Sequence, residues 1–226
     1  MPDMTGQFFD IFSDTLGRGS LEMGILLTPA QMDQMARHAL ELEKWNRKFN
    51  LTTITDPAAM ARKHFLDAIA VQPYLGAGEK RLLDMGSGAG FPGLPLKLLN
   101  GELQVLLLDA SRKKVNFLKH VIRMLNLEKI KAVHGRVEDF HKDPDAAGQF
   151  DGVLARGFAS LASLAGLAAP LLTPAGTIYA LKGPAVTGEI TPDLEKVFFV
   201  RCDPYQLPFG GDNRCLVRLT QKQKSS

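Results

Sequence analysis

A short glycine-rich segment between an apolar run and a helical pattern constrains the fold of this 226-residue chain more than any other feature. The segment runs from Asp84 to Gly93 and follows Arg81-Leu82-Leu83, which reads as a strand. Glycines let the backbone turn tightly and approach a ligand closely. A strand, a glycine turn and a helix in this order begin a doubly wound α/β sheet, whose ligands bind beyond the carboxyl ends of the strands.

From Lys80 onward, short apolar runs alternate with helical patterns. This order predicts right-handed crossovers and a Rossmann-like, mostly parallel sheet of seven strands with helices on both faces. The last two strands have little helix between them, so we expect a hairpin at one edge of the sheet. After Arg81–Asp84, the predicted strands are Gln104–Leu108, Ile130–Val133, Phe150–Ala155, Thr177–Leu181, Val197–Val200 and Cys215–Leu219.

The first 78 residues are predicted to be mostly helical. Thr28-Pro29 is a helix-start signal, because threonine caps and proline needs no amide donor. Asp56-Pro57 repeats the signal for a helix that continues to about Tyr74. We expect residues 1–78 to form an N-terminal helical extension and 79–226 the sheet domain, together as one compact unit. One apolar helix face carries Met32, Met35, Ala39, Leu42, Trp45 and Phe49.

The spacing of the glycines indicates which class of ligand the loop binds. The loop has the pattern G-x-G-x-G, whereas the dinucleotide fingerprint G-x-G-x-x-G would need a glycine where Phe91 stands, and no Walker lysine is present. An acidic residue before G-x-G-x-G is typical of S-adenosylmethionine-dependent methyltransferases of class I, and a sulfonium ligand gains from Asp84. The alternative is a merely structural glycine turn. The predicted cofactor-binding residues are Asp84, Gly86, Ser87, Gly88, Gly90, Asp109 for the ribose hydroxyls, and Val137 and Glu138 for the adenine. For Val137 and Glu138, an ordinary polar loop is the alternative.

The substrate side is predicted at the end of the fourth strand. The Asn/Asp-Pro-Pro-aromatic motif of amino-methylating enzymes is absent there, so methylation of an exocyclic amine is disfavoured. Guanine N7 has a free lone pair and no proton, so its attack needs positioning at about 3 Å and no general base. Arg156 is a candidate to recognise guanine O6 or a phosphate, or else to salt-bridge the sheet end. Lys182 is the second candidate, with an ordinary surface lysine as the alternative.

The net charge of +3 conceals a segregation of charge. Residues 110–136 hold eight basic side chains and one acidic one, whereas the rest of the chain is slightly acidic. On a helix that begins near Ser111, four of these basic residues lie opposite the apolar stripe of Val115 and Leu118, and Lys114 falls on the apolar side. They form a candidate RNA-binding face, with a solvated helix surface as the alternative. The predicted RNA-binding residues are Arg112, Lys113, Lys119 and Arg123.

Several other polar residues each have a structural and a functional interpretation. His64 and Asp67 are three residues apart on one helix face, so they either form a buried pair or line the guanine pocket. Asn46 is a candidate for substrate positioning, whereas Asn50 suits a left-handed helix cap. Trp45 and Phe49 are expected in the core.

The two cysteines suggest no further chemistry. Cys202 and Cys215 could face each other across the last strands, but we expect small buried residues rather than a redox pair. No metal site is predicted, because His64 and Asp67 lack a third ligand at usable spacing.

Taken together, the motifs resemble the 16S ribosomal RNA (guanine-N7) methyltransferase G family, also called glucose-inhibited division protein B. The resemblance implies methylation of one guanine in the decoding-region loop of 16S RNA. It also implies cofactor contacts at Gly86, Phe91, Val137, Glu138 and Arg156. Departures are mild, such as Lys63 in place of arginine. The resemblance covers about Thr28 to Arg218 and rests on residues 45–52, Asp56-Pro57, residues 63–67, the glycine loop, Leu108-Asp109-Ala110, Arg136-Val137-Glu138 and Ala155-Arg156-Gly157.

These observations predict a monomeric cytoplasmic enzyme that uses S-adenosylmethionine and acts on 16S RNA or the 30S subunit. No membrane segment is expected, because the most apolar stretch, Leu161–Leu181, is broken by Pro170 and Pro174. The N-terminus lacks the pattern of a signal peptide. Two rival hypotheses remain: a small-molecule methyltransferase, and a non-catalytic RNA- or ribosome-binding module that senses the cofactor.

Overall fold

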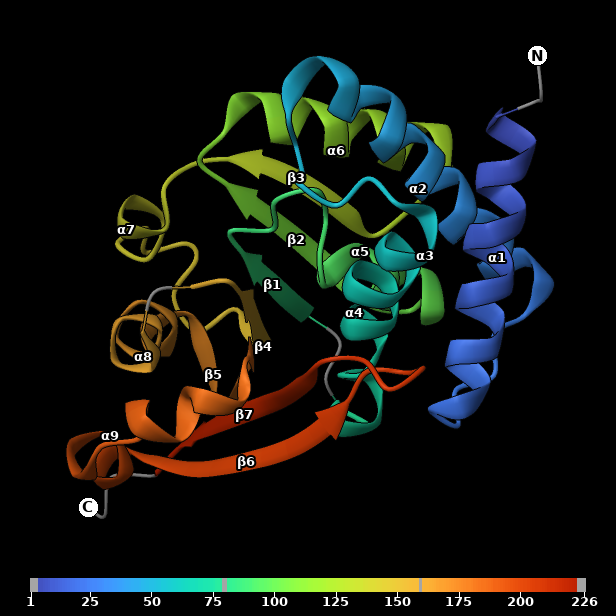
Figure 1. The fold of residues 1–226 in the computed structure, drawn as a ribbon. Coiled ribbons are helices and arrows are strands. Elements are labelled where there is room, and N and C mark those ends of the chain that lie inside the picture. Colours follow the sequence, from blue (N-terminus) through green and yellow to red (C-terminus); the bar gives the residue numbers. More distant parts are fainter. Residues whose placement is uncertain (1–3, 79–80, 159, 223–226) are drawn as a thin grey trace.

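A seven-stranded sheet forms the centre of the molecule, in the order β3-β2-β1-β4-β5-β7-β6 (Figure 1). The computed structural model describes residues 4–78, 81–158 and 160–222, so residue 79, the first of the predicted sheet domain, lies outside it. All neighbours pair in parallel except β7, which is antiparallel to β5 and β6. The predicted mixed sheet with a hairpin at one edge is thereby confirmed. Its strands are β1 (Arg81–Met85), β2 (Gln104–Asp109), β3 (Ile130–His134), β4 (Phe150–Arg156), β5 (Leu172–Lys182), β6 (Phe198–Gln206) and β7 (Asn213–Gln221).

The last three strands are longer than predicted. β5 begins at Leu172, and the hairpin of β6 and β7 extends to Gln206 and Asn213. Backbone pairing across the hairpin carries the strands beyond their apolar runs, because ladder hydrogen bonds do not require apolar side chains.

Helices cover both faces of the sheet, as alternation along the strands requires. Leu82 and Leu154 pack among the helices of the N-terminal part, whereas their neighbours Leu83 and Val153 pack among those of the C-terminal part. The helices are α1 (Met4–Glu22), α2 (Pro29–Phe49), α3 (Pro57–Met60), α4 (Asp67–Ile69), α5 (Gly93–Leu99), α6 (Arg112–Met124), α7 (Val137–Phe140), α8 (Leu161–Ala168) and α9 (Pro192–Val197); shorter 3₁₀ and π segments are η1 (Ala61–Leu66), η2 (Gln72–Tyr74), η3 (Ala169–Leu171) and η4 (Pro184–Glu189).

The N-terminal helices begin and end as the capping signals predict. The Thr28 side chain accepts from the Gln31 amide at 3.2 Å, and the Gln31 side chain accepts from the Thr28 amide at 2.8 Å, which completes a capping box. Asn50 ends α2 in the left-handed conformation, with φ 49°. Phe49 was expected in the core, but as the last residue of the helix it packs on Trp45 and stays 38% exposed. Trp45 itself is partly buried against Phe117.

The helix predicted from Asp56 to Tyr74 is present in altered form. It starts at α3, passes through the π-helical segment η1 and continues as α4 and η2. Single π turns inside helices are frequent at functional sites. Here the π turn holds Lys63 and His64, immediately before Asp67.

The two cysteines depart from the prediction. Cys202 and Cys215 are joined by a disulfide between β6 and β7, with Cα atoms 6.1 Å apart. Pairing of Cys202 with Val217 places Cys215 diagonally across on the same face of the hairpin. The two cysteines are 13 positions apart and face each other across the last strands, as the sequence allowed, but the expectation of two unpaired buried residues was wrong because the strand register brings their side chains within bonding distance.

Among the described residues, each helix is too short or too polar to span a bilayer. The same residues contain no group of three or more His, Cys, Asp or Glu arranged to hold a metal ion.

Candidate active site

The glycine loop lies between β1 and α5, where the strand order reverses from β2 to β4 around β1 (Figure 1). The amides of Gly86 and Ser87 both donate to the Leu108 carbonyl, at 2.8 and 3.0 Å. The Gly88 amide donates to the Asp109 carboxylate at 2.9 Å. These bonds tie the loop to the end of β2, so the loop has one defined conformation at the switch point of the sheet.

Two glycines of the loop face open space. Gly86 has φ +71° and Gly88 has φ +59°, a region that side chains rarely adopt. A Cβ atom on Gly86 would meet nothing within 4 Å, and one on Gly88 would meet only the Gly86 carbonyl oxygen at 3.9 Å. The glycines are therefore required by backbone conformation, and the space beside them is available to a ligand.

Gly90 is different, because a Cβ there would approach Leu118 and Leu94 at 3.0 and 3.1 Å. Ser87 is also turned inward, with 1% of its surface exposed. Both residues therefore support the loop from the protein side.

Asp84 lies directly beneath the loop and is fully buried. One carboxylate oxygen accepts from the Gly93 amide at 2.7 Å, whereas the other has no hydrogen-bond partner in the structure. Burial raises the pKa of Asp84 to about 7, against the opposing effect of the Gly93 hydrogen bond. The carboxylate thus fastens the start of α5 and leaves one buried oxygen free.

Asp109 ends β2 and connects the glycine loop to α6. Its second oxygen accepts from the Ser111 amide at 2.7 Å. Ser111 is the N-cap residue of α6, but its side chain makes no capping bond. Asp109 therefore holds the residue that precedes α6, and each of its oxygens still has a second lone pair for a hydroxyl donor.

A stack of rings supports the loop from below. Phe91 is 3% exposed and lies between His38 at 5.2 Å and His64 at 4.7 Å, with the rings within 18° of parallel. His38 comes from α2 and bonds the Ala89 carbonyl through Nε2 at 2.9 Å. Burial lowers the pKa of His38 to about 4, so the neutral ring donates this bond at pH 7. The N-terminal part of the chain thereby holds the glycine loop.

The residues predicted for the adenine follow β3. Val137 is buried at the first turn of α7, and Glu138 beside it is exposed. This places one apolar and one acidic residue at the carboxyl end of the strand next to β2.

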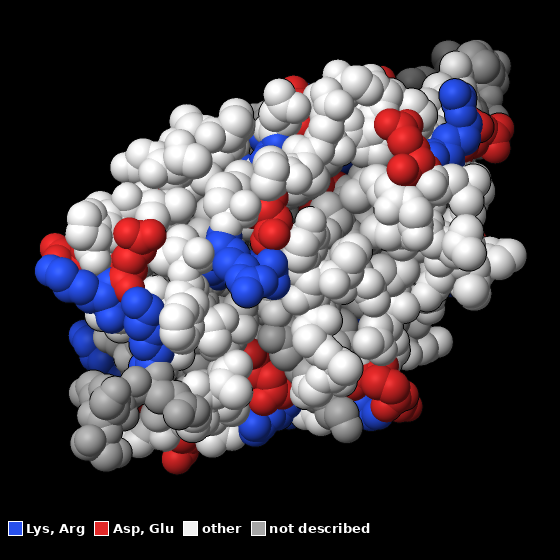
Figure 2. Space-filling view, turned by 90° about the horizontal axis from the view of Figure 1, so that it is seen from below, with Lys and Arg blue, Asp and Glu red and all other residues white. Residues whose placement is uncertain are grey.

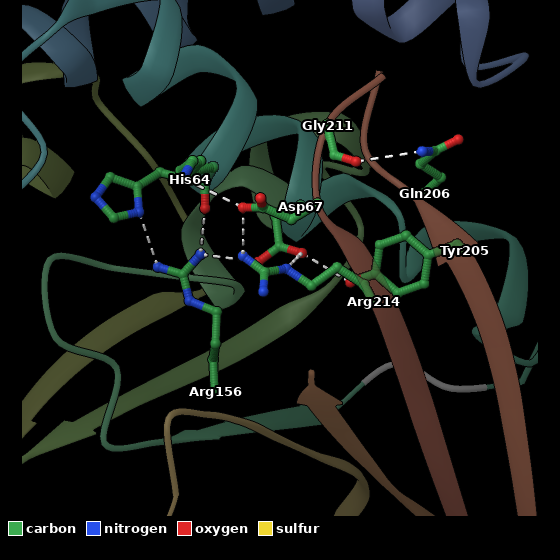
Figure 3. Close-up of polar contacts among 9 residues, drawn as sticks. His64, Asp67, Arg156, Tyr205, Gln206, Gly211 and Arg214 are labelled. Carbon is green, nitrogen blue, oxygen red and sulfur yellow. Dashed lines mark hydrogen bonds and ion pairs between the residues drawn. The ribbon is translucent and has the colours of Figure 1, made fainter. Parts of the chain in front are cut away.

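Arg156 ends β4 and forms the centre of a polar cluster with the residues around it (Figure 3). It donates to the Lys63 carbonyl at 3.0 Å, to Asp67 at 3.3 Å and to Nδ1 of His64 at 3.2 Å. Its guanidinium also lies 5.1 Å from the centre of the Phe91 ring. Burial and the Arg156 charge lower the pKa of His64 to about 3, so the ring is neutral. Because Nδ1 accepts from Arg156, Nε2 carries the proton and donates to Thr52 at 2.9 Å.

Asp67 joins this cluster to the C-terminal hairpin. Its side chain is 4% exposed and accepts from the Tyr205 hydroxyl at 2.7 Å. Arg214 of β7 lies 3.5 Å from the same oxygen. Three segments that are far apart in sequence therefore converge on one carboxylate, beside a cavity of about 390 Å³.

Comparisons with known proteins identify the group to which this chain belongs. The model of the family described as rRNA small subunit methyltransferase G matches residues 31–217. The ribosomal RNA small subunit methyltransferase G of Geobacter metallireducens is 38% identical over 94% of this chain and 97% of its own. The chain belongs to the rRNA small subunit methyltransferase G family.

Another member of this family, from Roseiflexus castenholzii, is 41% identical over 78% of this chain and 76% of its own. Solved structures that are more distant share the fold alone. A SAM-dependent methyltransferase from Aquifex aeolicus has a TM-score of 0.53 at 17% identity and covers 75% of this chain and 96% of its own. A precorrin-6y C5,15-methyltransferase from Geobacter metallireducens has a TM-score of 0.52 at 13% identity, over 70% and 87% of the two chains. The fold class predicted from the sequence is confirmed.

In this member of the rRNA small subunit methyltransferase G family, two further candidates lie at the margin of the cluster. Lys182 ends β5, is 10% exposed and donates to both oxygens of Glu189 at 3.1 and 3.0 Å. Asn46 is buried and accepts from the Thr52 amide at 2.9 Å, so it supports the residue that bonds His64.

The structure thus groups the predicted residues into two neighbouring sets. The loop set comprises Asp84, Gly86, Ser87, Gly88, Gly90, Phe91 and Asp109, and the cluster set comprises His64, Asp67 and Arg156, with Asn46 and Lys182 at its margin. The four predicted RNA-binding residues lie apart on the exposed face of α6. Sequence reasoning missed His38, Tyr205 and Arg214. His38 interrupts the apolar stripe of α2 and was the one signal available, whereas Tyr205 and Arg214 are placed by the hairpin register.

Proposed function

We propose that this protein transfers a methyl group from S-adenosylmethionine to N7 of a guanine in the decoding-region loop of 16S ribosomal RNA. The observation that carries the proposal is the juxtaposition of the two sets in a chain of this family. The open glycine loop and the Arg156 cluster meet through the Phe91 ring, which touches both. A cofactor on the loop and a base in the cavity would therefore be neighbours.

The loop set fits S-adenosylmethionine. Gly86 and Gly88 leave open space where a side chain would stand, and Asp109 has acceptor capacity for ribose hydroxyls. The buried, unpartnered oxygen of Asp84 lies beneath the site, and the ionised form of this side chain would suit a sulfonium cation, whose own charge would favour that ionisation. Val137 and Glu138 would hold the adenine. When bound, this cofactor supplies a methyl group on a positively charged sulfur.

The cluster set suits a nucleophile that needs no base. Both ring nitrogens of His64 are engaged, and both oxygens of Asp67 have donors or cations. None of these groups is available to remove a proton, and guanine N7 carries none. The protein would contribute the positioning of the reactants. Arg156 would direct its planar donor group toward guanine O6, and the Phe91 ring under the guanidinium would hold Arg156 in place relative to the loop.

The RNA itself would bind along α6. Arg112, Lys113, Lys119 and Arg123 are exposed, and α6 begins three residues after Asp109. The opposite edge of the molecule differs. Figure 2 shows the side on which β6 lies, where basic and acidic side chains occur in small mixed groups between uncharged areas. On the side seen in Figure 2, charges of opposite sign are therefore mixed. We also propose that the protein is a monomer and acts in the cytoplasm, where ribosomes are present.

Methyl transfer and RNA binding test the proposal against its rivals. The protein is incubated with labelled S-adenosylmethionine and either 16S RNA or 30S subunits that lack the modification, at two salt concentrations. Label in the RNA, with binding that weakens as salt rises, is expected because neutralised phosphates release counterions. Label in small molecules only would support the first rival. Cofactor binding and RNA binding without transfer would support the second.

A further inference from the structure

The cavity beside Arg156 carries more positive charge than its carboxylates balance. Its wall includes Lys63, Asp67, Arg156, Lys182 and Arg214. Lys182 is neutralised by Glu189, and Lys63 pairs with Asp212 at 3.2 Å. Asp67 then stands between two arginines, so one positive charge remains. A cavity of this kind favours an anionic ligand.

The two arginines differ in what holds them. Arg156 has three hydrogen bonds within the protein, to Lys63, Asp67 and His64, and its side chain is 21% exposed. Most of its donor capacity is used before a substrate arrives, so we regard it as fixed in position.

Arg214 is held by charge alone. Among the described residues, its guanidinium has ion pairs to Asp67 at 3.5 Å and Asp212 at 3.6 Å, but no hydrogen bond. Its Nε atom is buried and lacks a hydrogen-bond partner. A guanidinium has five N–H donors in a planar fork that matches a phosphate. Arg214 therefore has more free donor capacity for an anion than Arg156, which already makes three hydrogen bonds within the protein.

A second cavity meets the first at Arg214. It has a volume of about 670 Å³ and lies along the hairpin, between Pro184 of η4 and Pro204 and Tyr205 of β6. Arg214 lines both cavities. A nucleotide chain that places one base in the first cavity and its neighbour in the second must pass its phosphate over this residue.

We propose that Arg214 is the phosphate-binding residue of this site and holds the backbone phosphate of the target nucleotide, while Arg156 faces the base. The proposal rests on the proposed function. Asp67 and Tyr205 position Arg214. The Asp67 oxygen that pairs with Arg214 also accepts a hydrogen bond from the Tyr205 hydroxyl, which holds that oxygen in place.

Direct binding of two probes tests it without requiring turnover. Guanosine 5′-monophosphate and guanosine are titrated into the protein and followed by NMR. The wild type is expected to bind the monophosphate about 10- to 100-fold more tightly, as for a hydrogen-bonded charge pair. Arg214→Gln is expected to reduce this preference to less than about threefold. In RNA binding, the same change is expected to lower the salt slope by about one.

The matched control is Arg218→Gln. Arg218 lies on the same strand, but it is hydrogen-bonded to Asp203 at 2.7 Å and lines neither cavity. Its replacement should leave the monophosphate preference intact. Arg214→Lys, which retains the charge, is the second variant in case Arg214→Gln does not fold, and it should keep part of the preference.

No preference in the wild type, or an undiminished preference in Arg214→Gln or Arg214→Lys, overturns the proposal. An equal loss in Arg218→Gln also overturns it. Failure of the proposed function would be recognised separately, as an absence of methyl transfer to RNA by the wild type.

Discussion

The two halves of the active site are built in opposite ways. The loop half presents backbone to its ligand, and its shape comes from glycine conformation and from amides bonded to Leu108 and Asp109. The cluster half presents side chains, which are held by one another across Asp67 and Arg156. The first half comes from residues 84–91 and Asp109 at the end of β2, whereas η1, α4, β4, β6 and β7 together make the second.

This difference determines how each half fails. A backbone cradle tolerates no added atom, because the ligand occupies the space where a side chain would stand. A network of side chains loses strength in steps, since the remaining partners keep some of the geometry. Substitutions in the loop half should therefore abolish ligand binding, whereas substitutions in the cluster half should weaken function only in part.

The largest effect is expected for Gly86→Asp in the loop half. The residue has φ +71°, and its missing side chain opens the cradle, so aspartate adds both strain and bulk. Cofactor affinity, measured by calorimetry, should fall more than about 100-fold, because the backbone strain and the steric exclusion of the ligand each cost free energy. Gly101→Asp is the control, since a Cβ there also meets nothing within 4 Å and the residue is remote from the loop. Equal losses in both variants would contradict the cradle.

Arg156→Lys tests the cluster half. Lysine keeps the charge but cannot reproduce the fork that bonds the Lys63 carbonyl, Asp67 and His64. Methyl transfer to RNA should fall about 10- to 100-fold in kcat/KM, which corresponds to one or two charged hydrogen bonds. Cofactor affinity should change less than about threefold, in contrast with Gly86→Asp. A large loss of cofactor affinity would show that the halves are not separate.

The two halves should respond oppositely to pH. The folded-state pKa of Asp84, about 7, lies above the ordinary value of 3.8 that the unfolded chain has, so Asp84 makes unfolding easier as pH rises from about 4 to 7. The folded-state pKa of His64, about 3, lies below 6.5, so its contribution is lost as pH falls.

Denaturant unfolding of Asp84→Asn and His64→Gln measures this opposition. The free energy of unfolding of Asp84→Asn, taken relative to that of the wild type, should rise by about 1.4 kcal/mol for each unit that pH increases between roughly pH 4 and 7. For His64→Gln, the same difference in the free energy of unfolding should fall as pH increases, in the range below roughly pH 6.5. The exposed Asp145→Asn is the control and should stay parallel to the wild type. Slopes of the same sign in the two active-site variants would contradict the account.

The smallest effect is expected outside both halves, on α6. Lys119→Glu combined with Arg123→Glu should weaken RNA binding about tenfold at physiological salt and spare cofactor binding, because exposed charges act through counterion release. Lys196→Glu with Arg201→Glu makes the same charge change on α9 and β6, at the other edge of the sheet. Equal weakening by both pairs would show that net charge, and not the α6 face, attracts RNA.

The loop half could be predicted from the sequence, and the cluster half only in part. Gly86, Gly88 and Asp109 lie in local motifs whose conformation follows from residue type, as do the caps at Thr28 and Asn50. Arg156 and Asp67 were found as single candidates. Their partners could not be, because Tyr205 meets Asp67 across 138 positions of sequence.

The hairpin register explains the other misses. It brings Cys202 beside Cys215 and places Arg214 at the cavity, and neither relation has a local signal. Phe49 was misplaced for a simpler reason, since helical periodicity continues to the last residue of α2 although its packing surface ends earlier.

The chemical identity of the methylated nucleoside tests the central claim most directly. 16S RNA labelled by this protein is digested to nucleosides and analysed by mass spectrometry against standards. The account predicts 7-methylguanosine from a single site, because the cluster half offers a fixed donor and no free base. Label on an exocyclic amine or a ribose oxygen would require a different arrangement of groups and would contradict it.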